Sequence, residues 1–301
     1  MKKIINDPTA VVDEMLDGLA YIHSDLVYRV EGFDIIARKS EKTGKVGLIS
    51  GGGSGHEPSH AGFVGEGMLS AAICGAVFTS PTPDQVLQAI KEADEGAGVF
   101  MVIKNYSGDI MNFEMAQEMA EMEGIEVASV IVDDDIAVED SLYTQGRRGV
   151  AGTILVHKIL GDAARAGKSL TEIKALADEL VKNIHTVGLA LSGATVPEVG
   201  KPGFVLADDE IEFGIGIHGE PGYRKEKMQP SKDLAKELVE KLSQSLELKS
   251  GKKIGLLING MGATPLMEQY VFAADVANLL TEAGVEVVYK KLGNYMTSID
   301  M

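Results

Sequence analysis

The sequence predicts an α/β protein of two domains, each built on a sheet with flanking helices, and with a largely parallel sheet in the first. Near-continuous apolar runs of strand length alternate with helix-length stretches, as in parallel sheets that helices cover on both faces. The chain has 301 residues, of which 45% are hydrophobic. This is enough to build about two domains with cores of their own.

The first domain is expected over residues 1–183. Its first helix is predicted to start at Asp7 and Pro8, an N-cap followed by proline at the first helical position, and to end near His23. The strands expected next are Val46–Ser50, Ser70–Phe78, Val99–Lys104 and Val127–Val132. The remaining helices are expected at Pro83–Ala93, Ile110–Glu123, Val150–Ala166 and Lys168–Lys182.

The second domain is expected over residues 184–301. It opens with two segments rich in strand and turn residues, and helices and strands then alternate again. The elements expected there are a helix at Ser231–Leu246, a strand at Lys253–Asn259, a helix at Pro265–Ala283 and a strand at Val285–Tyr289.

Composition narrows the classes of function. The 28 basic and 45 acidic residues give a net charge of −17, which argues against binding nucleic acid or an anionic membrane. The N-terminal lysines precede no apolar run, and no apolar run is long enough to span a bilayer, so a cytoplasmic protein is expected. Cys74 is the only cysteine, so neither an internal disulfide nor a cysteine-based metal site is expected.

The segment GLISGGGSGHEP, residues 47–58, has the strand-then-glycine form of a phosphate loop but matches neither nucleotide motif. The Walker pattern needs Gly-Lys-Ser/Thr, and the dinucleotide pattern needs a third glycine where Pro58 stands. His56 would lie at the carboxyl end of a parallel strand, where α/β folds bind ligands. The residues alone leave a functional and a structural His56 equally open.

A second glycine segment, GIGIHG, matches the dinucleotide pattern literally, but no helix pattern follows it. His218 therefore stands among Gly214, Gly216, Gly219 and Gly222 with no nucleotide site to serve. Glycines leave room for close backbone approach. From spacing alone, a tight turn with an incidental histidine is slightly favoured over a functional one.

The third candidate is VIKNYSGD, where a strand ends at Lys104 and Asp109 leads into a helix. Asp109 is either the N-cap of that helix, an active-site carboxylate, or both. In the acidic loop 133–135, a solvated loop is favoured over a Mg²⁺ site. For Arg147 and Arg148, phosphate binding and a salt-bridge or capping role are equally open.

Several motifs together resemble the substrate-binding K subunits of phosphotransferase-linked dihydroxyacetone kinases, over essentially the whole chain. They also resemble the first domain of the single-chain, ATP-dependent kinases. The motifs are SGGGSGHEPSHAGFVGEGMLSAAICGAVFTSPTPDQ, IKNYSGD, GRRGVAGT, GIGIHGEPG, NGMGATPLMEQY and GNYMTSID. Chains of this family continue for a few tens of residues more, which leaves two alternatives for the second domain: a truncated C-terminus or the absence of its closing strands.

The resemblance implies a role for each candidate. His218 would attack the ketone carbon of dihydroxyacetone and hold it as a hemiaminal, while His56 and Asp109 handle protons. Substrate binding would fall to the set Gly53, Ser54, Gly55, His56, Lys104 and Asp109. No metal or cofactor is expected in this chain, because ADP and Mg²⁺ would be carried by a helical L subunit that a phosphocarrier protein recharges. A homodimer is also implied.

A related possibility is a dihydroxyacetone sensor that coactivates a transcription factor without phosphoryl transfer. A sensor needs the covalent trap, His218, but not the proton-handling pair. His56 and Asp109 are both present, which favours the kinase subunit.

Overall fold

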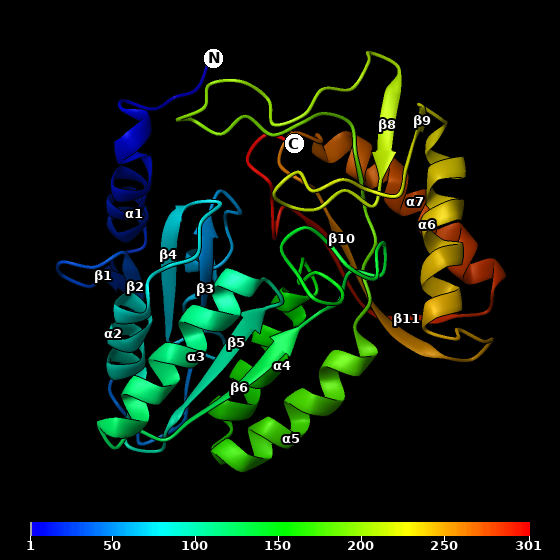
Figure 1. The fold of residues 1–301 in the computed structure, drawn as a ribbon. Coiled ribbons are helices and arrows are strands. Elements are labelled where there is room, and N and C mark those ends of the chain that lie inside the picture. The colour runs from blue at the N-terminus through cyan, green and yellow to red at the C-terminus, as the bar shows by residue number, and fades with distance from the viewer. Residues whose placement is uncertain (1) are drawn as a thin grey trace.

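The computed structural model describes residues 2–301, and its first part confirms the predicted α/β class. Six strands form one sheet in the order β1-β2-β4-β3-β5-β6, shown in Figure 1. β4, β3, β5 and β6 run parallel, while β2 pairs antiparallel with β4 and β1 pairs antiparallel with β2. The strands are β1 Val27–Arg29, β2 Ile35–Arg38, β3 Gly47–Ser54, β4 Ala71–Val77, β5 Val99–Lys104 and β6 Val127–Val132.

Helices cover both faces of this sheet, as its apolar strands require. On β5, Phe100 packs with α1, α4 and α5 on one face, and Met101 packs with α2 and α3 on the other. The helices are α1 Val11–Ile22, α2 Pro83–Ala93, α3 Ser107–Met122, α4 Thr153–Arg165 and α5 Leu170–Leu180, with 3₁₀ turns at Pro8–Ala10, Ala61–Phe63 and Val181–Asn183. All the helices predicted in this half are present, most within three residues of their predicted ends.

The second part holds two small sheets. Three antiparallel strands form one, β7 Leu189–Ala190, β8 Glu210–Phe213 and β9 Arg224–Lys227. Two parallel strands form the other, β10 Lys253–Asn259 and β11 Glu286–Gly293. The flanking helices are α6 Ser231–Ser245 and α7 Leu266–Glu282, side by side in Figure 1. The boundary between residues 183 and 184 stays a prediction.

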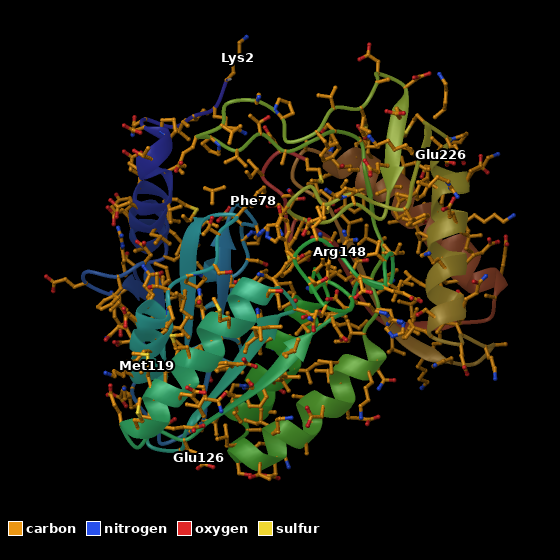
Figure 2. The ribbon with its side chains drawn as sticks, viewed as in Figure 1. Lys2, Phe78, Met119, Glu126, Arg148 and Glu226 are labelled. Atoms are coloured by element: carbon orange, nitrogen blue, oxygen red, sulfur yellow. The ribbon has the colours of Figure 1, made fainter. Side chains whose placement is uncertain are left out.

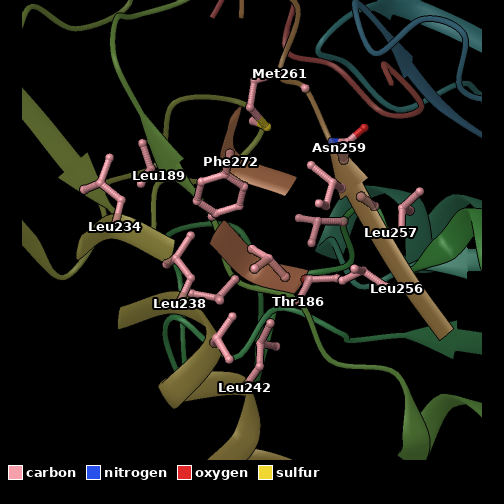
Figure 3. A pocket seen from close by; sticks show the side chains of 18 of the residues that line it. Thr186, Leu189, Leu234, Leu238, Leu242, Leu256, Leu257, Asn259, Met261 and Phe272 are labelled. Carbon is pink, nitrogen blue, oxygen red and sulfur yellow. The ribbon is translucent and has the colours of Figure 1, made fainter. Parts of the chain in front are cut away.

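An apolar cavity of about 480 Å³ is lined mostly by this second part and, on one side, by residues 150–155 of the first. Figure 3 shows its wall, made by side chains of β7, α6, β10 and α7 such as Leu189, Leu238, Leu256 and Phe272. None of His56, Asp109 or His218 lines it. The candidate site therefore lies outside this cavity.

The C-terminal segment returns to the glycine-rich loop of β3. The Thr297 and Ile299 N–H groups donate to the carbonyls of His56 and Gly55, at 3.1 and 2.8 Å. The Thr297 hydroxyl donates to the Glu57 carbonyl at 2.9 Å. These bonds fasten the two halves of the chain together around His56. Within residues 2–301, no helix combines the length and apolarity needed to cross a membrane.

Candidate active site

The glycine-rich end of β3 is shaped by close approach to its neighbours rather than by a phosphate. A Cβ on Gly52 would lie 2.5 Å from Lys104 Nζ, and one on Gly53 would lie 2.5 Å from the Thr79 backbone nitrogen. Gly55 has a φ of +101°, and its N–H donates to the Glu57 carboxylate at 3.0 Å. Because a carboxylate of the chain already occupies this N–H, the loop differs from a phosphate cradle.

This loop carries His56 to His218, 162 residues away in sequence. Their Nε2 atoms lie 3.1 Å apart, and the ring planes meet at 74°. His56 is fully buried, and its Nδ1 lies 2.7 Å from the Thr297 carbonyl oxygen. A carbonyl only accepts, so His56 carries its proton on Nδ1. The side chain of His218 is 15% exposed, so it is the imidazole that a ligand can reach.

Aromatic rings and a carboxylate enclose the His218 imidazole, instead of the cage of glycines that the sequence suggests. Phe78 and Tyr106 meet it edge to face, with ring centroids 5.2 and 4.7 Å away. Glu220 Oε1 lies 3.0 Å from His218 Nδ1, and Glu220 Oε2 accepts the His218 backbone N–H at 2.9 Å. A Cβ on Gly216 would fall 2.0 Å from Glu220 Oε2, so that glycine makes room for the carboxylate.

Lys104 and Asp109 form a buried ion pair beside the histidines. Lys104 Nζ lies 3.3 Å from Asp109 Oδ2, and both side chains are almost fully buried. The N-cap reading of Asp109 is wrong, because α3 begins at Ser107 with Tyr106 as its N-cap. Asp109 instead lies in the first helical turn, and its buried Oδ1 has no hydrogen-bond partner. An unpaired buried acceptor is costly, so this oxygen can receive a hydroxyl from a ligand.

The surroundings of the site shift the pKa values of His56 and Glu220. Burial, and then the charges of His218 and Lys104, hold the pKa of His56 well below its ordinary value of 6.5, so His56 is neutral at physiological pH. Burial raises the pKa of Glu220, but its hydrogen bonds and charge interaction with His218 outweigh this and leave the pKa below its ordinary value. Glu220 is therefore an ionised carboxylate facing His218.

A family model described as the Dak1 domain matches residues 17–301. The chain belongs to the Dak1 family. A dihydroxyacetone-binding subunit of a PTS-dependent dihydroxyacetone kinase of Lactococcus lactis is 70% identical, and the match covers all of this chain and 90% of that protein. The corresponding subunit of kinase 1 of Listeria innocua is 62% identical, over 100% of this chain and 92% of the relative.

Solved Dak1 structures share the fold. A dihydroxyacetone kinase operon co-activator superposes with a TM-score of 0.90 at 46% identity, covering 96% of this chain and 89% of that one. The dihydroxyacetone kinase of C. freundii superposes with a TM-score of 0.88 at 34% identity, covering all of this chain. This Dak1 chain spans 55% of that kinase.

Four other residues singled out from the sequence make structural contacts in this Dak1 chain. Ser54 lies in the loop, but its hydroxyl donates to the Gly75 carbonyl at 2.7 Å and so joins β3 to β4. Asp134 and Asp135 are buried, which corrects the prediction of a solvated acidic loop. Asp134 accepts the N–H groups of residues 150 and 152, and Asp135 pairs with buried Arg148, which bears out the salt-bridge reading of that arginine.

Sequence reasoning missed four residues that complete the site, Phe78, Tyr106, Glu220 and Thr297. Phe78, labelled in Figure 2, lies near the end of β4 and stacks on His56 with a centroid distance of 5.1 Å. Thr297 supplies the carbonyl that fixes the His56 tautomer. Only Glu220 gave a usable signal, since a carboxylate two residues after a candidate histidine can hold its ring. The others come from distant segments, and only the fold brings them together.

A second buried histidine pair predicts how stability depends on pH. His60 Nδ1 lies 2.9 Å from His157 Nε2, and burial, then Lys104, lowers the pKa of His157 to about 3. Between the ordinary pKa of 6.5 and pH 3, the unfolded chain binds more protons at this site, so acidification destabilises the fold. Replacing His157 with glutamine should reduce the stability lost between pH 7 and pH 5 by about 2 kcal/mol.

Urea unfolding of the wild type and this variant at both pH values measures the difference. His23→Gln is the matched control, because His23 is exposed and its loss should leave the pH dependence unchanged. Equal losses in the His157 variant and the wild type would contradict a neutral, buried His157.

Proposed function

We propose that this chain is the dihydroxyacetone-binding subunit of a phosphotransferase-dependent dihydroxyacetone kinase. The observation that carries the proposal is the contact between His56 and His218, beside a buried Asp109 with an unpaired oxygen. The relatives from Lactococcus lactis and Listeria innocua, at 70% and 62% identity along the whole chain, bear that name and support the same conclusion.

His218 is the proposed nucleophile. In its neutral form, the lone pair on Nε2 adds to the ketone carbon of dihydroxyacetone, a C–N bond forms, and the carbonyl π electrons move to oxygen. The new oxygen takes a proton, and His56 Nε2, 3.1 Å from His218 Nε2, is the proposed relay that passes it on. The product of this step is a hemiaminal that keeps both terminal hydroxyl groups free.

Asp109 is the proposed base for phosphoryl transfer. Its unpaired Oδ1 can accept the proton of a terminal hydroxyl as that hydroxyl attacks phosphorus. Lys104 holds the other carboxylate oxygen, so the base keeps a fixed orientation. The glycines at 53 and 55 let the loop lie close to Phe78, which a Cβ at either position would meet at 2.8 Å.

Covalent trapping fits the chemistry of so small a substrate. Dihydroxyacetone is tiny and uncharged, so weak contacts alone give little affinity. Rejecting glycerol by shape would contribute only about 1–3 kcal/mol. Glycerol has no carbonyl, so a nucleophilic histidine converts this small difference of shape into a difference of reaction type.

The phosphoryl donor is proposed to be a nucleotide with Mg²⁺ on a helical L subunit, recharged by a phosphocarrier protein. The one Gly-Lys-Ser of the chain, residues 167–169, lacks the first Walker glycine, since Asp162 stands there, and its serine caps α5. The Gly55 N–H of the glycine-rich loop is occupied by Glu57. A homodimer working in the cytoplasm completes the proposal.

Mg-ATP is therefore expected not to bind to the isolated chain in the micromolar range. The strong net negative charge of −17 opposes nucleotide binding as well. Isothermal titration calorimetry measures this directly. Clear one-to-one binding at micromolar ATP would show that the glycine-rich loop has been misread.

The alternative function is a dihydroxyacetone-sensing coactivator. The Lactococcus lactis protein named DhaKLM operon coactivator DhaQ is 46% identical to this chain. The kinase subunit is favoured because the kinase subunits of Lactococcus lactis and Listeria innocua kinase 1, at 70% and 62% identity, are more similar than this coactivator. A sensor also has no use for the base at Asp109.

Mixing the chain with an L subunit loaded with phosphorylated nucleotide, and with dihydroxyacetone, tests the proposal. Formation of dihydroxyacetone phosphate at a rate that depends on both proteins is the expected result. Tight dihydroxyacetone binding without any product would favour the sensor.

A further inference from the structure

The two site histidines form a hydrogen-bonded chain between two groups that only accept. One end is the Thr297 carbonyl, 2.7 Å from His56 Nδ1, and the other is the Glu220 carboxylate, 3.0 Å from His218 Nδ1. The middle link joins the two Nε2 atoms at 3.1 Å. Each end therefore needs a proton on a ring nitrogen, and the middle link needs one more.

Two neutral imidazoles carry one ring proton each, so together they are one proton short of completing this chain. The complete chain makes the pair a cation. Because burial, His218 and Lys104 disfavour the charged form of His56, the positive charge belongs on His218, against Glu220. The depressed pKa of Glu220 agrees with a carboxylate that faces a cation.

We infer that Glu220 is a positioning residue that fixes the Nδ1–H tautomer of His218 and retains the extra proton on the histidine pair. This inference rests on the proposed covalent trapping at His218. Its geometric basis is a carboxylate that is 2% exposed and held by both the ring and the backbone N–H of His218, in space that Gly216 leaves open.

The resting pair carries three ring protons, and the hemiaminal needs three: one on the new oxygen and one on each Nδ1. His56 Nε2 first takes the proton from His218 Nε2, which frees the lone pair for attack on the ketone carbon. The proton then passes to the new oxygen, and one proton stays on each Nδ1. The alkylated His218 ring keeps the positive charge, and Glu220 remains its counter-ion.

Two other cations lie near this pair, and each is paired with a carboxylate of its own, although Arg148 Nη1 has no hydrogen-bond partner. Lys104 is paired with Asp109 at 3.3 Å, and Arg148 is paired with Asp135 at 2.6 Å. The remaining titratable neighbours are Glu57, whose carboxylate accepts the Gly55 N–H, and Tyr106, whose ring meets His218. Glu220 is the carboxylate that hydrogen-bonds the pair.

The test is the pH profile of adduct formation, measured without any partner subunit. Dihydroxyacetone labelled with ¹³C at the ketone carbon is added, and the protein-bound signal of the tetrahedral carbon is followed by NMR. The adduct of the wild type should disappear as rising pH removes the extra proton. In Glu220→Gln this loss should move to lower pH by about 1–3 units, since a neighbouring opposite charge shifts a titration by that much.

Two further variants separate charge from structure. Glu220→Asp keeps the charge, so its adduct should disappear over nearly the same pH range as that of the wild type, even if less adduct forms. Glu212→Gln removes another buried carboxylate, which accepts the Gly222 N–H. This variant should lose its adduct over the same pH range as the wild type. If folded Glu220→Gln forms no adduct at any pH while Glu220→Asp does, the inference also stands.

Loss of the adduct over the same pH range in Glu220→Gln and the wild type would overturn the role of Glu220 and leave covalent trapping intact. Equal loss of adduct in Glu220→Gln and Glu220→Asp would also overturn it. Absence of an adduct in the wild type at every pH would instead refute the proposed function, and this inference with it.

Discussion

Replacing His218 with alanine is expected to abolish tight binding of dihydroxyacetone and, with it, turnover. The variant lacks the nitrogen that adds to the ketone, and the remaining contacts to so small a molecule are weak. The loss of kcat/KM should be on the order of 10³-fold or more, as for other residues that act as covalent nucleophiles. Native mass spectrometry should find an adduct of one substrate mass on the wild type only.

His23→Ala is the control for this variant, because it removes an exposed imidazole far from the site in sequence and should keep the adduct. His218→Gln tests whether a polar side chain suffices without a nucleophilic nitrogen, and it should behave like alanine. An equal amount of adduct on His218→Ala and on the wild type would contradict the assignment of His218 as the nucleophile.

Replacing Asp109 with asparagine is expected to separate binding from catalysis. The amide cannot take the hydroxyl proton, so kcat with the partner subunit in excess should fall by about 10²–10⁴-fold. This corresponds to about 3–5 kcal/mol of activation free energy. The adduct should still form, because trapping depends on His218 and its neighbours.

A structural role for Asp109 predicts a different outcome. Asp109 is one partner of a buried pair with Lys104, and breaking such a pair can cost about 3–5 kcal/mol of stability. Asp135→Asn is the matched variant, since it removes the carboxylate of the other buried pair, with Arg148. If Asp109→Asn melts as low as Asp135→Asn and keeps a near wild-type kcat, Asp109 is a structural residue.

The sequence predicted the parallel strands and the helices well because their signals are long and local. β5 and α2 agree with their predicted ends residue for residue. The antiparallel strands β1 and β2 were missed, because three and four residues are too few to show a period. Their pairing depends on the neighbouring β4, which is a tertiary contact.

The candidate site was predictable in its parts but not in its assembly. Position at the end of a strand left a functional and a structural His56 equally open, and spacing alone slightly favoured an incidental His218. The family resemblance gave His56, Lys104 and His218 their roles. What brings His56 and His218 to 3.1 Å is the return of the C-terminal segment, whose Thr297 holds the opposite side of the His56 ring. Contacts across 160 to 240 residues leave no local pattern to read.

The central claim, covalent trapping of the ketone by His218, is tested most directly by a crystal structure of the chain soaked with dihydroxyacetone. The account predicts continuous electron density from His218 Nε2 to a tetrahedral substrate carbon, with a terminal hydroxyl on Asp109 Oδ1. A planar ketone at van der Waals distance from His218, at full occupancy, would contradict it.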